Sequence, residues 1–246
     1  MWAPSVVVRA AWSNAGVQRR GSQRDPRPRY GVVLLLTIAT FSFTLAATGD
    51  TGWVRLTEIS LQAATLVAAV RTSGASRHIV RLAIVISALA VLSATAIAVS
   101  APEAHSGTRL LQAALAILAP IAVARGLRRQ LRAEGVTFQV VLGALSIYLL
   151  LGMSFAFVFG SVAALSSRAF FHQPLVGDGT IADQTYFSFT TLTTTGYGDL
   201  TANVGLPRAL AILEAIFGQL YLVTVVALVV SNFGRGRPAQ AGKDGA

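Results

Sequence analysis

Six long apolar stretches constrain the fold of this sequence more than any other feature. Each is close to the roughly 20 residues that a helix needs to cross the hydrocarbon core of a membrane. Hydrophobic residues make up 54% of the chain and charged residues only 12%, unlike the average soluble protein. Because backbone polar groups in lipid must be satisfied internally, we expect an all-α integral membrane protein with six transmembrane helices. The stretches cover residues 31–49, 55–71, 80–101, 107–125, 137–165 and 206–232.

The positive charges are concentrated around alternate connections between these stretches and at the two ends of the chain. The chain contains 20 Lys and Arg residues and has a net charge of +10. All but four of these 20 residues lie before the first stretch, after the sixth, or in and immediately beside the second and fourth connections. Cationic loops stay in the cytoplasm, so we expect a multi-pass protein of the cell (plasma) membrane with both termini cytoplasmic. The basic segments also favour anionic lipids, and the charge needs no nucleic-acid partner to explain it.

The stretches and the charges together divide the chain into five parts. The arm over residues 1–30 is basic and polar, and we expect it to be disordered. It lacks the apolar core of a secretory signal, and an organelle transit peptide is the less favoured alternative. The other parts are a four-helix transmembrane domain (31–125), a basic cytoplasmic linker (126–136), a last unit (137–232) and a short cytoplasmic tail (233–246).

One polar segment interrupts the apolar pattern between the fifth and sixth stretches. Residues 191–200 read TLTTTGYGDL, and the preceding IADQTYFSFTTL (181–192) is apolar but about half as long as a membrane-spanning helix. We expect this pair to be re-entrant, because irregular backbone at membrane depth is tolerated only where it is buried in protein or lines a watery path. Gly196 and Gly198 permit left-handed φ at alternate residues. Such alternation turns successive carbonyl groups to one side, where they can replace the water around a monovalent cation.

The segment TTTGYGDL resembles the signature of the tetrameric potassium channels, whose selectivity filters are rings of backbone carbonyls. The resemblance extends over residues 137–232 and implies an outer helix (137–165), a pore helix (183–193), a filter loop (194–199) and an inner helix (206–232). Because the chain has one filter, the resemblance implies a homotetramer. K⁺ is then a permeant ion, and no cofactor is expected. The implied K⁺ sites are the carbonyls of Thr194, Thr195, Gly196 and Tyr197, with Gly198 at the outer mouth.

The same resemblance implies residues that support the filter. Asp199 stands where the family braces the filter from outside, and Gly218 stands at the inner-helix hinge. Tyr186 and Phe187 replace a common tryptophan pair, and Thr190 replaces a glutamate of some relatives. These departures alter the braces behind the carbonyls, so we expect filter rigidity to differ from that of relatives.

Two further features of the inner helix each have two interpretations. Glu214 lies within an apolar stretch, where a carboxyl group is costly unless paired. It either supplies a partner to the back of the pore helix or is a neutral acid bonded to a neighbouring hydroxyl. Leu222, Val226 and Val230 recur every four residues and share one helix face. They are candidates for the cavity and gate, although a lipid-facing or packing stripe has the same spacing.

The function that we expect is passive, potassium-selective conduction. A non-selective cation channel, or a non-conducting scaffold or regulatory subunit, is the alternative. We do not expect an enzyme, because the sequence shows no Ser–His–Asp set, carboxylate pair or metal-ligand cluster. Arg109 and Arg125 only flank the fourth stretch, whereas a voltage sensor needs several arginines within that helix. We therefore expect no steep voltage dependence.

Overall fold

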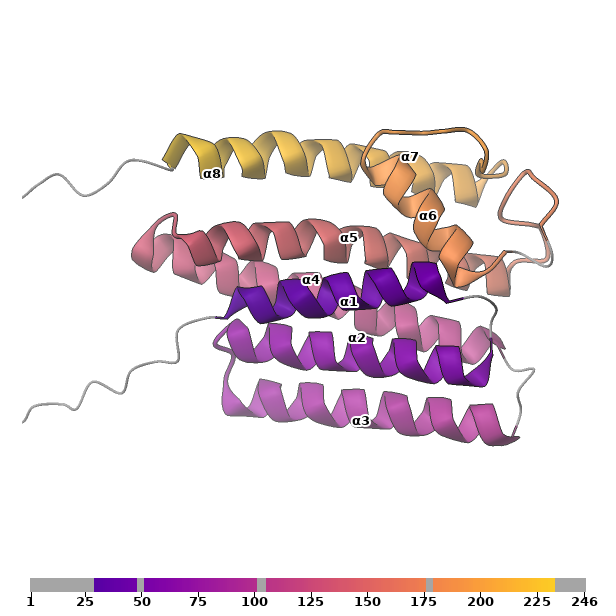
Figure 1. Ribbon diagram of the computed structural model, residues 1–246, viewed down its shortest axis with the longest axis horizontal. Helices are drawn as coiled ribbons and strands as arrows, with labels where there is room; N and C mark the ends of the chain where they lie inside the picture. The colour runs from indigo at the N-terminus through magenta and orange to yellow at the C-terminus, as the bar shows by residue number, and fades with distance from the viewer. Residues whose placement is uncertain (1–28, 48–50, 101–104, 176–178, 233–246) are drawn as a thin grey trace, which may run out of the picture.

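The computed structural model describes residues 29–47, 51–100, 105–175 and 179–232, and this part of the chain is helical. Figure 1 shows the long helices lying antiparallel to their neighbours in sequence. The start of α1, the α2–α3 turn, the α4–α5 turn and the end of α8 all lie at one end of the bundle (Figure 1). The elements are α1 (Tyr30–Ala46), α2 (Gly52–Thr72), α3 (Arg77–Ser100), α4 (His105–Glu134), α5 (Phe138–Leu165), α6 (Ile181–Leu192), α7 (Leu206–Tyr221), the π-helical η1 (Leu222–Val226) and α8 (Ala227–Asn232).

Four of the described helices are long and apolar enough to cross a membrane. They correspond to four of the six expected crossings. α1 is also apolar but has only 17 residues, and α2 has 21 residues but contains polar side chains such as Arg55, Glu58 and Gln62. Length and composition therefore identify four candidates, and six crossings remain a prediction. The four candidate spans are Arg77–Ile97, Arg109–Glu134, Phe138–Leu165 and Leu206–Val225.

The fourth helix differs from its expected boundaries. α4 continues through Pro120 to Glu134, so most of the expected linker is helical and continuous with the fourth stretch. Proline lacks an N–H, which leaves the carbonyl of residue 116 without its helical donor. The Ser154 hydroxyl on α5 lies 2.8 Å from Ala116 O and 2.6 Å from Leu150 O of its own helix, and its one proton can replace the missing donor when it points to Ala116. Leu127 is buried against the bundle, and Gly135, with φ +73°, follows the last helical residue.

The first five helices share one apolar core. Tyr30 and Val33 of α1, Ile59 and Leu66 of α2 and Leu115 of α4 are buried in it together. The core positions α1 beside α2 and α5, and α1 also reaches α6. Ring centroids of Phe41 on α1 and Phe189 on α6 lie 4.4 Å apart. The first helix, α1, therefore contacts the expected pore helix directly.

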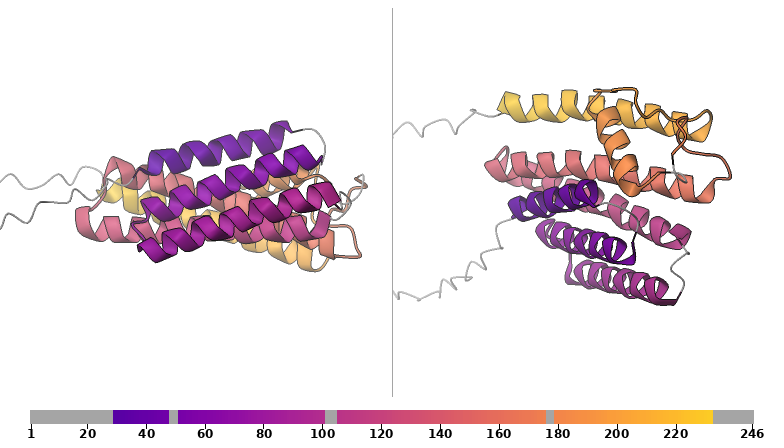
Figure 2. Two further views of the ribbon diagram at one scale, coloured as in Figure 1. Left: turned by 90° about the horizontal axis from the view of Figure 1, so that it is seen from below. Right: turned by 45° about the vertical axis from the view of Figure 1, so that its right-hand side comes forward.

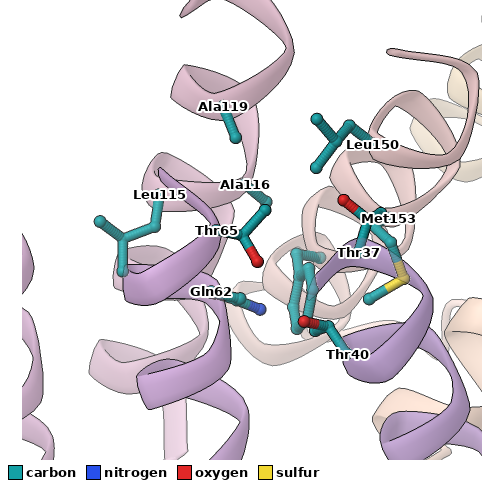
Figure 3. A pocket seen from close by; sticks show the side chains of 10 residues that line it. Thr37, Thr40, Gln62, Thr65, Leu115, Ala116, Ala119, Leu150 and Met153 are labelled. Carbon is teal, nitrogen blue, oxygen red and sulfur yellow. The ribbon is translucent and has the colours of Figure 1, made fainter. Parts of the chain in front are cut away.

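A small cavity lies in this bundle. It measures about 20 Å³ and is lined by Gln62, by threonines of α1 and α2, and by apolar side chains of α4 and α5. Figure 3 shows the Gln62 amide pointing into the same space as the hydroxyl of Thr40. The Thr37, Thr40 and Thr65 hydroxyls each donate to the carbonyl four residues earlier, at 2.8 Å. Neither amide atom of Gln62 has a hydrogen-bond partner among the described residues.

The elements after α5, from α6 to α8, form a separate layer over α5. Figure 2 shows α6 lying obliquely between α5 and α7. α6 contacts both α5 and α7, and α5 also contacts α7. Beyond α5, residues Ala169–Gln173 pair with Thr201–Asn203, for example through His172 N and Thr201 O at 2.9 Å. This pairing closes the outer loop around the entry and exit of α6.

Candidate ion-conduction site

The short helix α6 begins at a defined cap. The Thr180 hydroxyl accepts from Asp183 N, and the Asp183 carboxylate accepts from Thr180 N at 2.7 Å. Such a reciprocal capping box satisfies two of the free amides at a helix start. α6 then runs for 12 residues from Ile181, nearly matching the expected pore helix at 183–193. It enters the molecule near the end of α5, and the chain returns to the same end for the start of α7 (Figure 1).

The backbone after α6 alternates in hand. Thr194 has φ +58°, Gly196 has φ +54° and Gly198 has φ +81°, whereas Thr195 and Tyr197 have negative φ. Alternation of this kind directs successive carbonyls to the same side, which a regular strand does not do. Thr194 is the single described non-glycine residue with positive φ, a conformation that is uncommon for a β-branched residue.

Main-chain hydrogen bonds hold the start of this segment and leave its carbonyls available. Thr190 O accepts from Thr195 N at 2.9 Å and from Gly196 N at 3.0 Å. Within the described residues, no hydrogen bond reaches the carbonyls of residues 194–197. The side chains or glycines of residues 193–199 are all exposed in the single chain. Four successive oxygens therefore lie on exposed backbone without a donor from the described part of the chain.

Asp199 is held by a side chain of α6. The Tyr186 hydroxyl donates to Asp199 Oδ2 at 2.8 Å, and Leu200 N donates to Asp199 Oδ1 at 3.0 Å. The Tyr186 ring also stacks on Tyr197, with centroids 6.3 Å apart and planes 7° from parallel. The hydrogen bond to Asp199 raises the pKa of Tyr186 above its usual value. Tyr186 thus bridges α6 to both the tyrosine and the aspartate of the GYGD segment.

Glu214 faces the same helix from the other side. It is completely buried, and its Oε1 is hydrogen bonded to the Ser188 hydroxyl on α6. Ser188 also lies 2.7 Å from Gly152 O on α5. A serine hydroxyl has one proton, and a carbonyl oxygen can only accept. Both bonds exist together when Ser188 donates to Gly152 and Glu214 carries a proton that it donates to Ser188.

This arrangement joins the two interpretations of Glu214. The carboxyl group bonds to a neighbouring hydroxyl, and that hydroxyl belongs to the expected pore helix. The bond connects α7 to α6 and through Ser188 to α5. Whether this connection supports the filter stays a prediction.

Gly218 marks the closest approach between α7 and α6. A Cβ placed on Gly218 would lie 2.6 Å from Leu192 O and 2.7 Å from Leu192 Cδ1. Glu214 and Gly218 are the two buried residues of α7. The Tyr148 hydroxyl of α5 also reaches Leu192 O, at 3.3 Å. α5 and α7 therefore both contact the last residue of α6, two positions before Thr194.

The remaining candidate residues differ in how they relate to the segment 194–199. Phe187 is buried in an outer aromatic cluster with Phe159 and Phe171, and the Thr190 hydroxyl donates to Phe187 O within its own helix. Thr190 therefore contacts the filter segment through its main chain. Leu222 is exposed and begins the π-helical η1, where a four-residue spacing no longer repeats one face as it does in an α-helix. The side chains of Val226 and Val230 lie outside the described residues.

Sequence reasoning missed three contacts of this site. The Ser188 hydroxyl of α6 bonds to Gly152 O of α5, and the Tyr148 hydroxyl of α5 reaches Leu192 O at the end of α6. A serine, a glycine and a tyrosine in apolar helices are common, and only the packing of α5 on α6 distinguishes these three. The one sequence signal was the unpaired Glu214, which required some partner nearby.

Comparison with known proteins agrees with this geometry. Residues 143–235 match the model of a family described as "Ion channel". No curated protein matches the chain, and no solved structure matches it. The matched range contains most of α5, all of α6, the GYGD segment and the last helices. Residues 143–235 of the chain are therefore similar to the ion channel family.

Proposed function

We propose that this protein is a potassium-selective channel whose filter is the backbone of residues 194–197. The observation that carries the proposal is the alternation of positive and negative φ from Thr194 to Gly198. Together with carbonyls that accept no hydrogen bond from the described residues, this backbone can offer stacked oxygens to a dehydrated cation. Carbonyl ligands of this kind suit K⁺, and the GYG triplet is intact.

The conducting form is a homotetramer. Residues 193–199 are exposed in one chain, and irregular backbone at membrane depth must be covered by protein or face a watery path. The inner helix α7 exposes large apolar side chains such as Ile212, Phe217 and Leu220. Other copies of the chain can cover both surfaces around a closed axis, as cyclic symmetry requires of a ring.

The membrane orientation follows from charge. The basic turns lie at the end of the bundle opposite to the outer loop (Figure 1). We assign this basic end to the cytoplasm of a plasma-membrane protein, because cationic loops remain inside. α4 carries no arginine between Arg109 and Arg125, which supports a channel without steep voltage dependence.

Flux measurements test the proposal. The purified protein is reconstituted in liposomes, and K⁺ and Na⁺ uptake are compared. We expect selective K⁺ uptake, and Tyr197→Ala or Gly196→Ala should abolish it while leaving the helical content unchanged. Equal K⁺ and Na⁺ uptake would support the non-selective alternative, and no uptake by a correctly assembled oligomer would support the scaffold. Gly107→Ala is the matched control, because a Cβ at Gly107 meets no atom within 4 Å.

A further inference from the structure

An apolar crevice opens between α2, α3 and α4 near the basic end of the bundle. Its volume is about 400 Å³. Ile79 and Leu82 line it from α3, and Leu118 and Ile121 line it from α4. These four side chains are 41–58% exposed in the single chain. α3 is also less enclosed than α4, with 22% of its apolar window buried against 44% for α4. The crevice is therefore wide enough, and apolar enough, for a hydrocarbon chain.

Arginines surround the polar mouth of this crevice. Arg125 and Arg129 line the crevice itself. An adjoining recess of about 630 Å³ shares Arg129 with it and adds Arg71 and Arg77. All four arginines are exposed. Glu134 also lines the recess, so the mouth has a net positive charge.

Arg129 is fixed in place by the α2–α3 turn. Its Nη2 donates to Ser73 O, and a Cβ at Gly74 would overlap the guanidinium group. Gly74, with φ +63°, thus leaves room for the side chain. A guanidinium group has five N–H donors, so further donors remain for oxygen atoms of a bound anion. Arginine binds phosphate oxygens especially well because of this planar fork.

We propose that this crevice binds one anionic phospholipid. An acyl chain lies between α3 and α4, and the headgroup phosphate contacts Arg77, Arg125 and Arg129. Charge complementarity selects an anionic headgroup over a zwitterionic one, whose amine offsets the phosphate charge. The assignment to the cytoplasmic leaflet rests on the orientation proposed above, whereas binding itself does not depend on conduction. The bound lipid completes the packing of α3 against α4.

Native mass spectrometry of the full-length protein in detergent tests this site. The probes are phosphatidylglycerol and phosphatidylcholine with identical acyl chains. The test variant is Arg77→Gln with Arg125→Gln, which spares the structural bond of Arg129. The matched control is Arg128→Gln with Arg132→Gln, because these arginines are exposed on the same helix but line neither space. Both double variants remove the same net charge.

We expect the wild type to retain phosphatidylglycerol in preference to phosphatidylcholine. The test variant should bind phosphatidylglycerol roughly tenfold more weakly than the control variant does. Leu82→Trp, which fills the crevice, should weaken binding of both lipids. Tyr197→Ala should bind phosphatidylglycerol like the wild type, so a failure of conduction does not affect this result. Equal loss in the two double variants, or equal retention of both lipids by the wild type, would overturn the proposal.

Discussion

Gly218→Ala tests the contact between the inner helix and the end of the pore helix. The added Cβ would lie 2.6 Å from Leu192 O, whereas ordinary contacts begin at about 3.4 Å. The two elements must therefore separate by roughly 0.8 Å. Leu192 O is a main-chain atom at the end of α6 and cannot rotate away. Overpacking of this kind costs about 1–3 kcal/mol, while alanine in place of glycine gains about 1 kcal/mol in a helix.

The control for this substitution isolates the steric cost. Gly107→Ala in α4 receives the same helix gain without a contact, because its Cβ meets no atom within 4 Å. The difference between the two variants is thus about 1–3 kcal/mol. For a chain of this size the difference corresponds to roughly 2–12 °C in melting temperature. Thermal unfolding of the purified protein in detergent measures it.

The same substitution should change conduction. Displacement of Leu192 moves the backbone two residues before Thr194, so we expect lower K⁺ flux and lower selectivity over Na⁺ in liposomes. A Gly218→Ala protein that melts no lower than Gly107→Ala and conducts like the wild type would refute the close contact between α7 and α6.

Substitutions at four other positions test separate parts of the structure. Glu214→Leu should lower both the melting temperature and the flux, whereas Glu214→Gln, which can still donate to the serine on α6, should retain most of both; equal losses would argue against a protonated carboxyl group. Tyr186→Phe removes the hydrogen bond to Asp199 and should reduce K⁺ selectivity, measured from reversal potentials in mixed K⁺ and Na⁺; unchanged selectivity would contradict a bracing role. Gln62→Met should leave the melting temperature unchanged or raise it, because a buried amide without a protein partner is costly. Gln112→Met removes a hydrogen bond to the buried carboxyl group on α2 and should lower the melting temperature; an equal fall in both variants would show that the Gln62 amide has a partner.

The glycines of the filter segment could be interpreted from the sequence because glycine has a specific backbone role. Gly196 and Gly198 were expected to adopt left-handed φ, and both do. Thr194 completes the alternation, but nothing in a threonine indicates positive φ. Its conformation follows from the hydrogen bonds at the end of α6, which the sequence does not reveal.

The helix boundaries were predictable where a cap or a glycine marks them. Thr180 and Asp183 begin α6 with a capping box, and the expected start at residue 183 is close to it. The sequence did not reveal that α4 continues without interruption to Glu134, through most of the segment expected as a basic linker. Burial of Leu127 and the bond from Ser154 keep α4 helical, and both depend on how α5 packs.

A density map of the assembled protein in K⁺ tests the central claim most directly. We expect a ring of four chains with the carbonyl oxygens of residues 194–197 pointing to the shared axis, and ion density between successive oxygen layers. A map in which those oxygens point away from the axis, or in which a single chain closes on itself without a shared axis, would contradict it.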